Sequence, residues 1–449
     1  MPTEFSYRTR NEAITKLKDA TVDALIIGGG ITGSGVASIL AESGINVVLV
    51  EKGDFASGTS SGSSKLIHGG LRYLQQGRIR EVRNLIRERN YLRKNTEIVG
   101  DMEFHILIGK KSWSRATIRS GLFLYNILDG RFQIPRFRKN SGIYGHETEG
   151  YFTYMDAYTD DSRLVISNIC SAHAQGGVCL NYCEVLGVSK INGFYDVTVA
   201  DNYSRSTFSF QARAIVNCAG PWAEKVMRML GSTRVPSFRL SKGIHIVLPS
   251  SLFGIRNAVV FRSPLDGRQL FIIPRGEVVH LGTTDNYVQE PDDFSITDEE
   301  ITYLIQSASS VFRNINRSCI IAAFSGIRPL VSGSSNPGTA SRESLIIQEG
   351  SIVNVLGGKL TDYRTTSRDA ARRVIALLGL ERNINDLPRI SYHREGKPND
   401  FIYDIRYECA LTAEDILRRR EGLRIYSLDG GKSLEDKVYA DLAAEGLKG

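Results

Sequence analysis

The chain has 449 residues, of which 42% are hydrophobic and 23% are charged, and its formal net charge is +7. It has no apolar run of the roughly twenty residues that a membrane-spanning helix needs, and residues 1–20 lack the apolar core of a secretory signal. The six cysteines show no Cys-x-x-Cys pair and no metal spacing with histidine, so we expect neither a disulfide framework nor a metal site. We therefore expect a globular protein of a reducing compartment, whose charge is typical of a solvated surface.

After a polar lead-in with one expected helix, residues 11–17, the sequence has the pattern of a dinucleotide-binding βαβ unit. An apolar strand is followed by Gly28, Gly30 and Gly33, then by a helix and a second strand that ends on Glu51. Such glycines permit a sharp turn, a close approach of backbone to a pyrophosphate, and close packing of helix on strand. Glu51 stands where a carboxylate would hold a ribose hydroxyl. A tight turn in an ordinary α/β domain would explain the glycines alone. It would not explain why two strands, a helix and an acidic residue accompany them, so we favour a bound dinucleotide.

A serine-rich loop, residues 59–64, follows the second strand. Its hydroxyl and backbone N–H groups are suitable donors to an anionic pyrophosphate. The ordinary alternative for this composition is a flexible surface loop. The loop runs directly into His68, Arg72 and Tyr73.

Residues 78–94 have the apolar spacing of a helix, and the segment 110–139 is unusually basic. The basic segment carries eight Lys or Arg and one acidic residue, and it also contains Leu122, Phe123, Leu124, Tyr125 and Phe132. Cations and apolar side chains together can bind a membrane surface. The apolar residues can equally belong to the core, with the cations serving only solubility. Nothing else in the chain has the pattern of a nucleic-acid reader, so we expect no nucleic-acid partner.

The remaining chain alternates strands and helices. A helix is expected to begin at Asp160, and the apolar strand 214–216 ends on Asn217 and Cys218, the latter expected to be a buried packing residue. Further strands are expected over residues 185–210 and 237–285, and further helices over residues 296–316, 367–380 and 412–420.

Six motifs, in order, resemble those of the FAD-dependent glycerol-3-phosphate dehydrogenase family: residues 58–73, 217–222, 241–245, 282–285, 324–330 and 357–364. The resemblance covers most of the chain and favours the binding role of the serine-rich loop. It implies an α/β fold with an FAD-binding Rossmann-like domain, residues 22–105, 150–235 and 325–380. This domain is interleaved with an antiparallel-sheet substrate domain, residues 106–149 and 236–324. A short helical segment, residues 395–449, replaces the larger C-terminal domain that the family usually carries.

The resemblance also implies a reaction. Hydride from C2 of sn-glycerol 3-phosphate passes to flavin N5 of FAD, a base takes the C2 hydroxyl proton, and dihydroxyacetone phosphate is formed. A histidine suits the base because its ordinary pKa lies near physiological pH. We favour His245, with His68 as the other candidate, and expect Arg328 to stabilise the charge on the reacting oxygen.

The substrate's dianionic phosphate needs several cations, and by resemblance these are Arg72, Arg342 and Lys359, with Tyr73 as a hydroxyl donor. At residue 362 the family commonly has a threonine where this chain has Asp362, which adds a negative charge. The residues that the motifs assign to the cofactor are Gly28, Gly30, Ile31, Thr32, Gly33, Glu51, Lys52, Thr59, Ser60, Ser61, Ser64, Lys65, Leu66, His68, Ala219, Gly220, Trp222, Gly358, Lys359, Leu360 and Thr361.

Two other functions stay open. An amine or amino-acid oxidase of the same broader fold would need one arginine for a carboxylate, and a flavin-containing adaptor would need no turnover at all. For the dehydrogenase we expect a quinone as electron acceptor, with oxygen as the alternative that would make it an oxidase. We also expect peripheral attachment to the cytoplasmic face of the cell membrane, or a cytoplasmic location, and leave a homodimer open.

Overall fold

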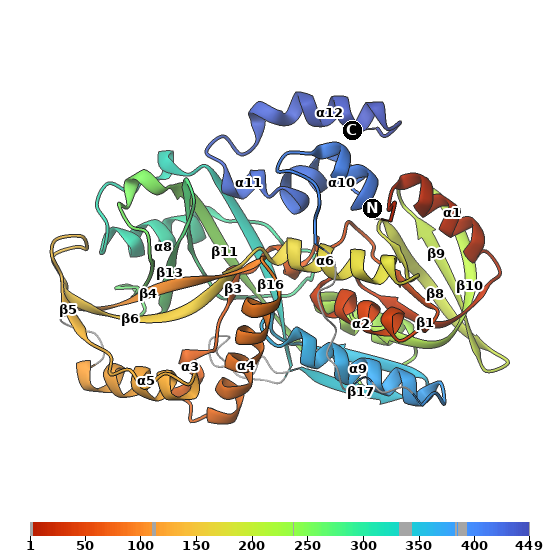
Figure 1. Cartoon of the computed structure of the whole chain (residues 1–449), viewed down its shortest axis with the longest axis horizontal. Coiled ribbons are helices and arrows are strands. Elements are labelled where there is room, and N and C mark those ends of the chain that lie inside the picture. Colours follow the sequence, from red (N-terminus) through yellow and green to blue (C-terminus); the bar gives the residue numbers. More distant parts are fainter. Residues whose placement is uncertain are drawn as a thin grey trace.

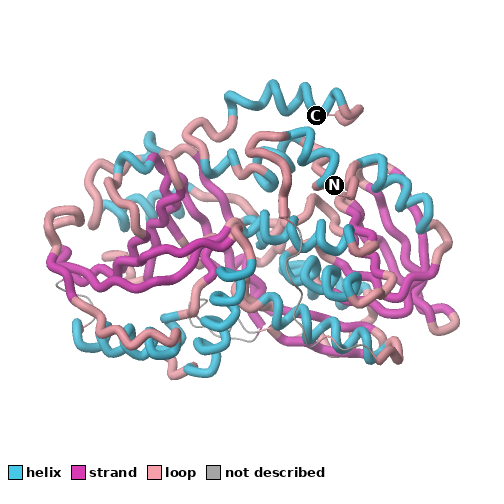
Figure 2. Tube along the Cα trace, viewed as in Figure 1, coloured by secondary structure: helices cyan, strands magenta, loops and turns pink. Residues whose placement is uncertain are grey.

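The computed structural model describes residues 3–109, 114–236, 238–331, 344–381, 384 and 393–448. Two β-sheets lie side by side, and the last helices of the chain lie above both of them (Figures 1 and 2). No helix in the described part of the chain is both long enough and apolar enough to cross a membrane.

The described helices are α1 Tyr7–Leu17, α2 Ile31–Glu42, α3 Leu71–Leu74, α4 Ile79–Asn95, α5 Arg115–Leu128, α6 Asp161–Ala174, α7 Ala223–Met229, α8 Asp298–Ser309, α9 Tyr363–Leu377, α10 Phe401–Tyr407, α11 Leu423–Tyr426 and α12 Glu435–Ala444. The strands are β1 Thr21–Ile27, β2 Val47–Val50, β3 Leu66–Ile67, β4 Val99–Gly109, β5 Phe137–Lys139, β6 Thr148–Thr159, β7 Val178–Leu180, β8 Cys183–Ile191, β9 Phe194–Asp201, β10 Ser206–Asn217, β11 Phe238–Pro249, β12 Ala258–Arg262, β13 Gln269–Arg275, β14 Val278–Gly282, β15 Asn286–Val288, β16 Ala322–Val331, β17 Leu345–Glu349 and β18 Ile352–Leu356.

The first sheet has a parallel centre and runs in the order β17-β18-β10-β1-β2-β7, with the hairpin β8–β9 joined to β10. Ile27 at the end of β1 lies between Val50 of β2 and Asn217 of β10. The carboxyl ends of these three strands therefore form one edge, which is where ligands bind in open α/β sheets.

The centre of this sheet is apolar because both of its faces are covered. On one face, Ala24 and Ile26 belong to a core that includes buried residues of α2, α6 and α9. On the other face, Leu25 packs with residues of α1 and of the β8–β9 hairpin. The βαβ unit expected from the glycines is present, and the mixed α/β fold is confirmed.

The second sheet is largely antiparallel and runs in the order β15-β11-β14-β13-β12-β4-β6-β3, with β16 joined to β11 and β5 joined to β6. Residues of α8 share a core with residues of β11, β13 and β14. Residues of α4 and α5 share another core with residues of β4 and β6. The expected domain boundaries at residues 105/106 and 149/150 fall inside β4 and β6, two long strands of this sheet. The domain ranges themselves stay a prediction.

Several expected elements are present with shifted ends. Asp160 and Thr297 are the N-caps of α6 and α8, and each side chain accepts a hydrogen bond from a backbone N–H of the first turn. α8 ends at Ser309, before the expected residue 316. In the tail, the expected helix 412–420 is a π-helical turn, Asp415–Arg420. The helices α10, α11 and α12 lie within the expected helical segment 395–449, but their individual positions were not predicted.

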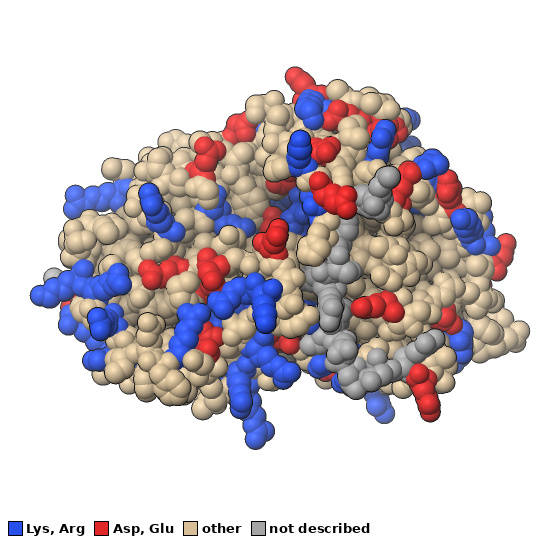
Figure 3. All heavy atoms as spheres, in the orientation of Figure 1, with Lys and Arg blue, Asp and Glu red and all other residues tan. Residues whose placement is uncertain are grey.

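The basic segment divides between core and surface. Leu122 and Tyr125 of α5 are each only 1% exposed and belong to the core beneath the second sheet, so they cannot enter a membrane interface. Phe132, at 86%, and Phe123, at 37%, are exposed. Lys and Arg side chains gather over α4 and α5 on the face drawn in Figure 3. The residues 110–113 at the start of the segment lie outside the described residues.

Candidate active site

The glycines after β1 make a close-packed junction between strand, helix and β10. Gly28 has φ +112°, and a Cβ there would lie 2.6 Å from the carbonyl oxygen of Cys218. A Cβ on Gly33 would overlap the carbonyl oxygen of Gly28, so only glycine lets α2 approach the strand. Gly30 is the N-cap of α2, whose free N–H groups and dipole suit an anion. Cys218 is a buried packing residue, as expected, and burial raises its pKa to about 12.

Glu51 directly follows β2 and faces the same junction. Its Oε2 accepts a hydrogen bond of 2.7 Å from the backbone N–H of Gly29, and its Oε1 accepts one of 3.0 Å from Gly53. Burial raises the pKa of Glu51, and these backbone bonds oppose that rise. The carboxylate is thereby held in one orientation at the strand end, where the sequence pattern places the ribose contact.

The serine-rich loop joins the two sheets. Ser60 Oγ accepts a 2.9 Å hydrogen bond from the N–H of Ile31 at the start of α2, and Thr59 Oγ1 donates a 2.5 Å bond to the carbonyl oxygen of Ile327 on β16. A Cβ on Gly62 would overlap the backbone of β16. The loop is therefore pressed between the helix N-terminus and the second sheet.

A cavity of about 1160 Å³ extends along this loop between the two sheets. The residues expected to form the site that line it are Gly28, Gly30, Ile31, Thr32, Glu51, Lys52, Thr59, Ser60, Ser64, Leu66, His68, Arg72, Tyr73, Ala219, Gly220, Trp222, Arg328, Gly358, Lys359 and Leu360. The structure thus brings together residues from six separate parts of the sequence on the wall of one cavity.

Five expected site residues do not line the cavity: Gly33, Ser61, Lys65, His245 and Thr361. Lys65 is buried in an ion pair with Asp161 and also donates to the carbonyl oxygen of Ser61 at 3.2 Å, so it supports the loop from behind. Thr361 Oγ1 lies 3.2 Å from both the backbone nitrogen and the backbone oxygen of His68. Arg342 lies outside the described residues.

Lys52 and Trp222 meet at one part of the cavity wall. The ammonium nitrogen of Lys52 lies 4.0 Å above the Trp222 ring, and both side chains bond to Asp292, at 3.0 Å and 2.9 Å. Asp292 was not predicted, because nothing in its local sequence distinguishes it from a solvated acid.

His245 lies on β11, one layer behind the cavity wall. Its imidazole is fully buried, and its Nε2 lies 3.0 Å from the hydroxyl oxygen of Ser64, which does line the cavity. Burial, together with the positive charges of Arg328, Lys65 and Arg418, lowers the pKa of His245 to about 3. His245 is therefore neutral, the form that can accept a proton, and it reaches the cavity through Ser64.

Arg328 on β16 crosses to the end of β14. Its Nη2 donates a 3.0 Å hydrogen bond to Thr283 Oγ1, and its Nη1 lies 3.3 Å from Asp285 Oδ1. A Cβ on Gly243 would overlap the guanidinium, so the glycine of β11 makes room for it. Thr283 and Asp285 belong to the 282–285 motif, so the sequence indicated their importance but not their contact with Arg328.

Lys359 is paired with a carboxylate, Glu81, that was not predicted to belong to the site. The Lys359 ammonium forms an ion pair with Glu81 of α4, and it lies 5.0 Å from the centre of the Tyr73 ring. Glu81 also forms an ion pair with Arg78. Asp362 accepts a 3.2 Å bond from the backbone N–H of Lys359. Burial raises the pKa of Asp362 to about 6, so this departure from the family pattern faces inward rather than to solvent.

The cavity wall combines an anion-binding helix terminus, a polar loop and several cations, and a buried neutral histidine, His245, lies behind it at Ser64. This set can hold a dinucleotide along the first sheet and a small anionic alcohol beside it. Such an arrangement is suited to removing a hydride and a proton from one carbon centre.

The family model described as FAD dependent oxidoreductase matches residues 23–357. The chain belongs to the FAD-dependent oxidoreductase family. FAD is therefore its cofactor, and the residues present fit it. The glycine junction leaves no room for side chains, and the cavity reaches from the α2 N-terminus to the second sheet.

Within this FAD-dependent oxidoreductase family, the chain is 36% identical to the D-erythritol 1-phosphate dehydrogenase of Brucella abortus, over 79% of this chain and 74% of that protein. It is also 36% identical to a glycerol-3-phosphate dehydrogenase of Pseudomonas tolaasii, over 78% and 70% of the two chains. The fold is similar to that of the FAD complex of the Bacillus halodurans glycerol-3-phosphate dehydrogenase. The TM-score is 0.77 at 24% identity, and the similarity covers 98% of this chain and 94% of that one.

Proposed function

We propose that this enzyme oxidises the C2 hydroxyl of sn-glycerol 3-phosphate and releases dihydroxyacetone phosphate. The observation that carries the proposal is the position of Arg72, Arg328 and Lys359 on the wall of the cavity that also contains the FAD cradle. A phosphate dianion needs several cations, whereas an amino-acid carboxylate needs one. The similarity to two dehydrogenases named for polyol phosphates supports the same class of substrate.

In this proposal Arg72, Tyr73 and Lys359 bind the phosphate, together with Arg342. Arginine can donate two parallel hydrogen bonds to phosphate oxygens, which fixes the orientation of the substrate. The phosphate would compete with Glu81 for Lys359, because the two anions would bind the same ammonium group. The affinity for substrate therefore depends on the negative charge of Glu81 as well as on the cations.

Bound FAD would supply the acceptor, at flavin N5, for the hydride that C2 loses when the alcohol becomes the ketone. The C2 hydroxyl proton passes to Ser64 as the Ser64 proton passes to Nε2 of His245. Arg328 stabilises negative charge on the reacting oxygen. His68 also lines the cavity and is the other candidate base.

The proposed electron acceptor is a quinone, reached at a membrane surface. Such a protein would attach peripherally at the cytoplasmic face through the part of residues 110–139 that is exposed. Among the described residues of that segment, Phe123 and Phe132 are large exposed aromatic residues, and Arg115, Arg119, Arg131 and Arg136 are cations. Cations near an anionic membrane surface contribute roughly 1 kcal/mol each.

A second candidate is the same reaction on a longer polyol phosphate. It is favoured by the equal identity, 36%, to the D-erythritol 1-phosphate dehydrogenase. Both candidates use the same cations and the same proton acceptor, and they differ in what occupies the cavity beyond the reacting carbon.

The test mixes the FAD-loaded enzyme anaerobically with glycerol 3-phosphate, erythritol 1-phosphate or one of a panel of amino acids. The flavin absorbance reports whether each compound reduces the flavin. We expect fast reduction by a polyol phosphate and none by amino acids. Reoxidation in parallel with a quinone analogue and with oxygen then identifies the acceptor. Fast reduction by an amino acid would contradict the proposal.

A further inference from the structure

The C-terminal segment, residues 401–444, contacts both sheets behind the serine-rich loop. Phe401 and Leu442 belong to the core on the helical face of the first sheet. Ile425 belongs to a small core with Val278 and Phe324 of the second sheet. Figure 1 shows α10, α11 and α12 above the junction of the two sheets.

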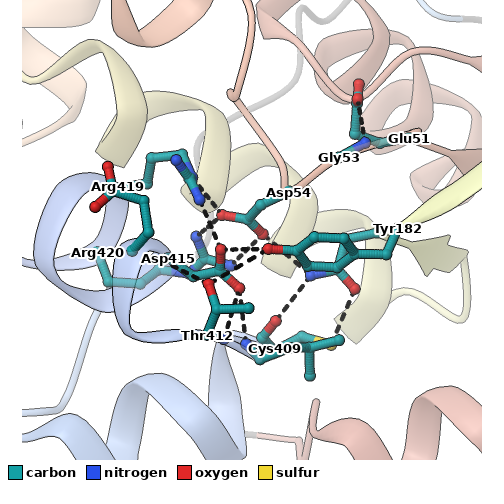
Figure 4. Close-up of polar contacts among 12 residues, drawn as sticks. Glu51, Gly53, Asp54, Tyr182, Cys409, Thr412, Asp415, Arg419 and Arg420 are labelled. Atoms are coloured by element: carbon teal, nitrogen blue, oxygen red, sulfur yellow. Dashed lines mark hydrogen bonds and ion pairs between the residues drawn. The ribbon is translucent and has the colours of Figure 1, made fainter. Parts of the chain in front are cut away.

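An ion-pair cluster attaches this segment to the turn that follows Glu51. Arg420 donates two hydrogen bonds to Asp54, of 2.7 Å and 3.0 Å, and Arg419 donates one of 2.7 Å (Figure 4). Burial raises the pKa of Asp54, but the charges of Arg420 and Arg419 outweigh it and lower the pKa to about 2. Asp54 is therefore charged at neutral pH and fixed to the tail, although 366 residues separate it from Arg420.

The next arginine in the same turn, Arg418, extends toward the site itself. Its Nη2 donates to the carbonyl oxygen of Ser61 at 3.3 Å, within the serine-rich loop. Its guanidinium lies 4.9 Å from the centre of the Phe324 ring, and that ring is stacked on His245 with centroids 4.9 Å apart and an angle of 11°. Arg418 thus contacts both the loop and the ring that supports His245.

Arg418 has few other partners. Among the residues that the structure describes, its Nη1 has no hydrogen-bond partner although it is buried. Burial lowers the pKa of Arg418, and nearby Asp161 opposes that shift. A buried guanidinium is costly to desolvate, so its placement here is not explained by stability alone.

We propose that Arg418 is a positioning residue for the cofactor site, and that the C-terminal segment is the back support of the serine-rich loop. The segment is held at Asp54 by Arg419 and Arg420. From there Arg418 fixes the Ser61 carbonyl and the Phe324 ring, so that Ser60 and His245 keep their positions relative to α2. The inference concerns the cofactor loop and does not depend on which alcohol is the substrate.

The test compares wild-type holoenzyme with Arg418→Met, Arg418→Lys and Arg424→Met. Arg424 is the matched control, because it lies in the same segment but pairs with Glu414 and Glu435 instead of the loop. Three quantities are measured without substrate: the FAD dissociation constant, amide hydrogen exchange over residues 57–65, and the melting temperature of the protein.

We expect Arg418→Met to weaken FAD binding by about tenfold or more, as expected for the loss of one charge-assisted hydrogen bond. Exchange over residues 57–65 should accelerate, and Arg418→Lys should restore part of the affinity. The melting temperature should fall by no more than the weaker FAD binding accounts for. An FAD affinity and an exchange rate within twofold of wild type in Arg418→Met would overturn the proposal.

A second variant covers the case in which Arg418→Met does not fold. The double variant Asp54→Asn with Arg420→Gln replaces the buried charge pair by neutral groups that can still bond, which limits the cost to folding. It loosens the same segment without altering Arg418. We expect weaker FAD binding here too, and wild-type affinity would contradict the supporting role of the segment. Because no substrate is present, neither result depends on the proposed reaction.

Discussion

Nε2 of His245 lies 3.0 Å from the hydroxyl oxygen of Ser64, and Ser64 lines the cavity whereas His245 does not. This relationship places a hydroxyl between the candidate base and any substrate. It predicts that the two residues act together in the proton transfer.

The first prediction concerns Ser64. Ser64→Ala should lower the rate constant of anaerobic flavin reduction by about 10²-fold or more, because a general acid–base path typically contributes 10²–10⁴-fold. Substrate affinity should change little. Stopped-flow absorbance measures both quantities, with Ser309→Ala on α8 as an exposed control. If Ser64→Ala reduces its flavin at the wild-type rate, the proton does not pass through this hydroxyl.

The second prediction concerns His245 and uses both kinetics and pH. His245→Asn should lower the flavin reduction rate rather than raise KM, since a base acts in the transition state. An effect confined to KM would transfer the role of base to His68. In that case His68→Asn should lower the flavin reduction rate.

His245 also predicts a pH dependence of stability. Its pKa is about 3 in the folded protein and near 6.5 when unfolded, so the unfolded chain binds the additional proton as pH falls below 6.5. Wild type should therefore lose about 2 kcal/mol of unfolding free energy at this residue between pH 7.5 and 5, and His245→Asn should not. Denaturant unfolding at the two pH values measures the difference. If wild type and His245→Asn lose the same unfolding free energy between pH 7.5 and 5, the imidazole is not held in its neutral form.

How much of this site is visible in the sequence depends on the range of the interactions. The βαβ unit, its glycines and the caps Asp160 and Thr297 follow from local rules, and their positions are confirmed. The burial of His245 behind Ser64, across 181 residues, is a tertiary contact that no periodicity reports. The same is true of the Asp54–Arg420 pair.

The tail shows a second limit. Residues 412–420 have a helical pattern, but the structure forms a π-helical turn there, in which Arg418 bonds to the Ser61 carbonyl while Arg419 and Arg420 both bond to Asp54. Intrinsic propensity indicates a helix of some kind and cannot specify a distortion that tertiary ion pairs impose. For the same reason, three consecutive arginines give no indication in the sequence that Arg420 is buried and that Arg418 and Arg419 are partly buried.

The third prediction concerns Arg328. Arg328→Ala should lower kcat/KM by about 10- to 150-fold, the equivalent of roughly 1.5–3 kcal/mol for one charge-assisted contact. Arg328→Lys should recover part of the loss, since it keeps the charge but not the paired donors. Arg317→Ala is the control, because Arg317 is exposed and pairs with Asp298. Unchanged steady-state kinetics in Arg328→Ala would remove the residue from the site.

The fourth prediction concerns Glu81. Its side chain is 12% exposed and holds Lys359, so Glu81→Gln should free that ammonium for a phosphate dianion. Substrate should bind about threefold to tenfold more tightly, as expected for roughly 0.6–1.4 kcal/mol from one partly buried charge. Titration of the flavin absorbance measures the dissociation constant, and the exposed Glu97→Gln serves as control. Weaker binding would mean that Glu81 positions Lys359 for the phosphate instead of competing with it.

The fifth prediction concerns the membrane. Flotation with anionic liposomes should show binding that weakens as salt rises, because the attraction of the cations is screened. Changing four cations of the basic segment to glutamine should weaken it further: Arg115, Arg119, Arg131 and Arg136. The matched control changes four cations elsewhere: Lys190, Arg205, Arg228 and Arg313. Equal flotation of the two quadruple variants would exclude the basic segment as the attachment surface.

The most direct test of the proposed function is anaerobic mixing of the FAD-loaded enzyme with sn-glycerol 3-phosphate while the flavin absorbance is followed. We expect stoichiometric bleaching of the flavin and one equivalent of dihydroxyacetone phosphate. The unphosphorylated alcohol should react far more slowly, because it lacks the phosphate that Arg72 and Lys359 would bind on the cavity wall. A flavin that stays oxidised with glycerol 3-phosphate and with erythritol 1-phosphate, but is bleached by an amino acid, would contradict it.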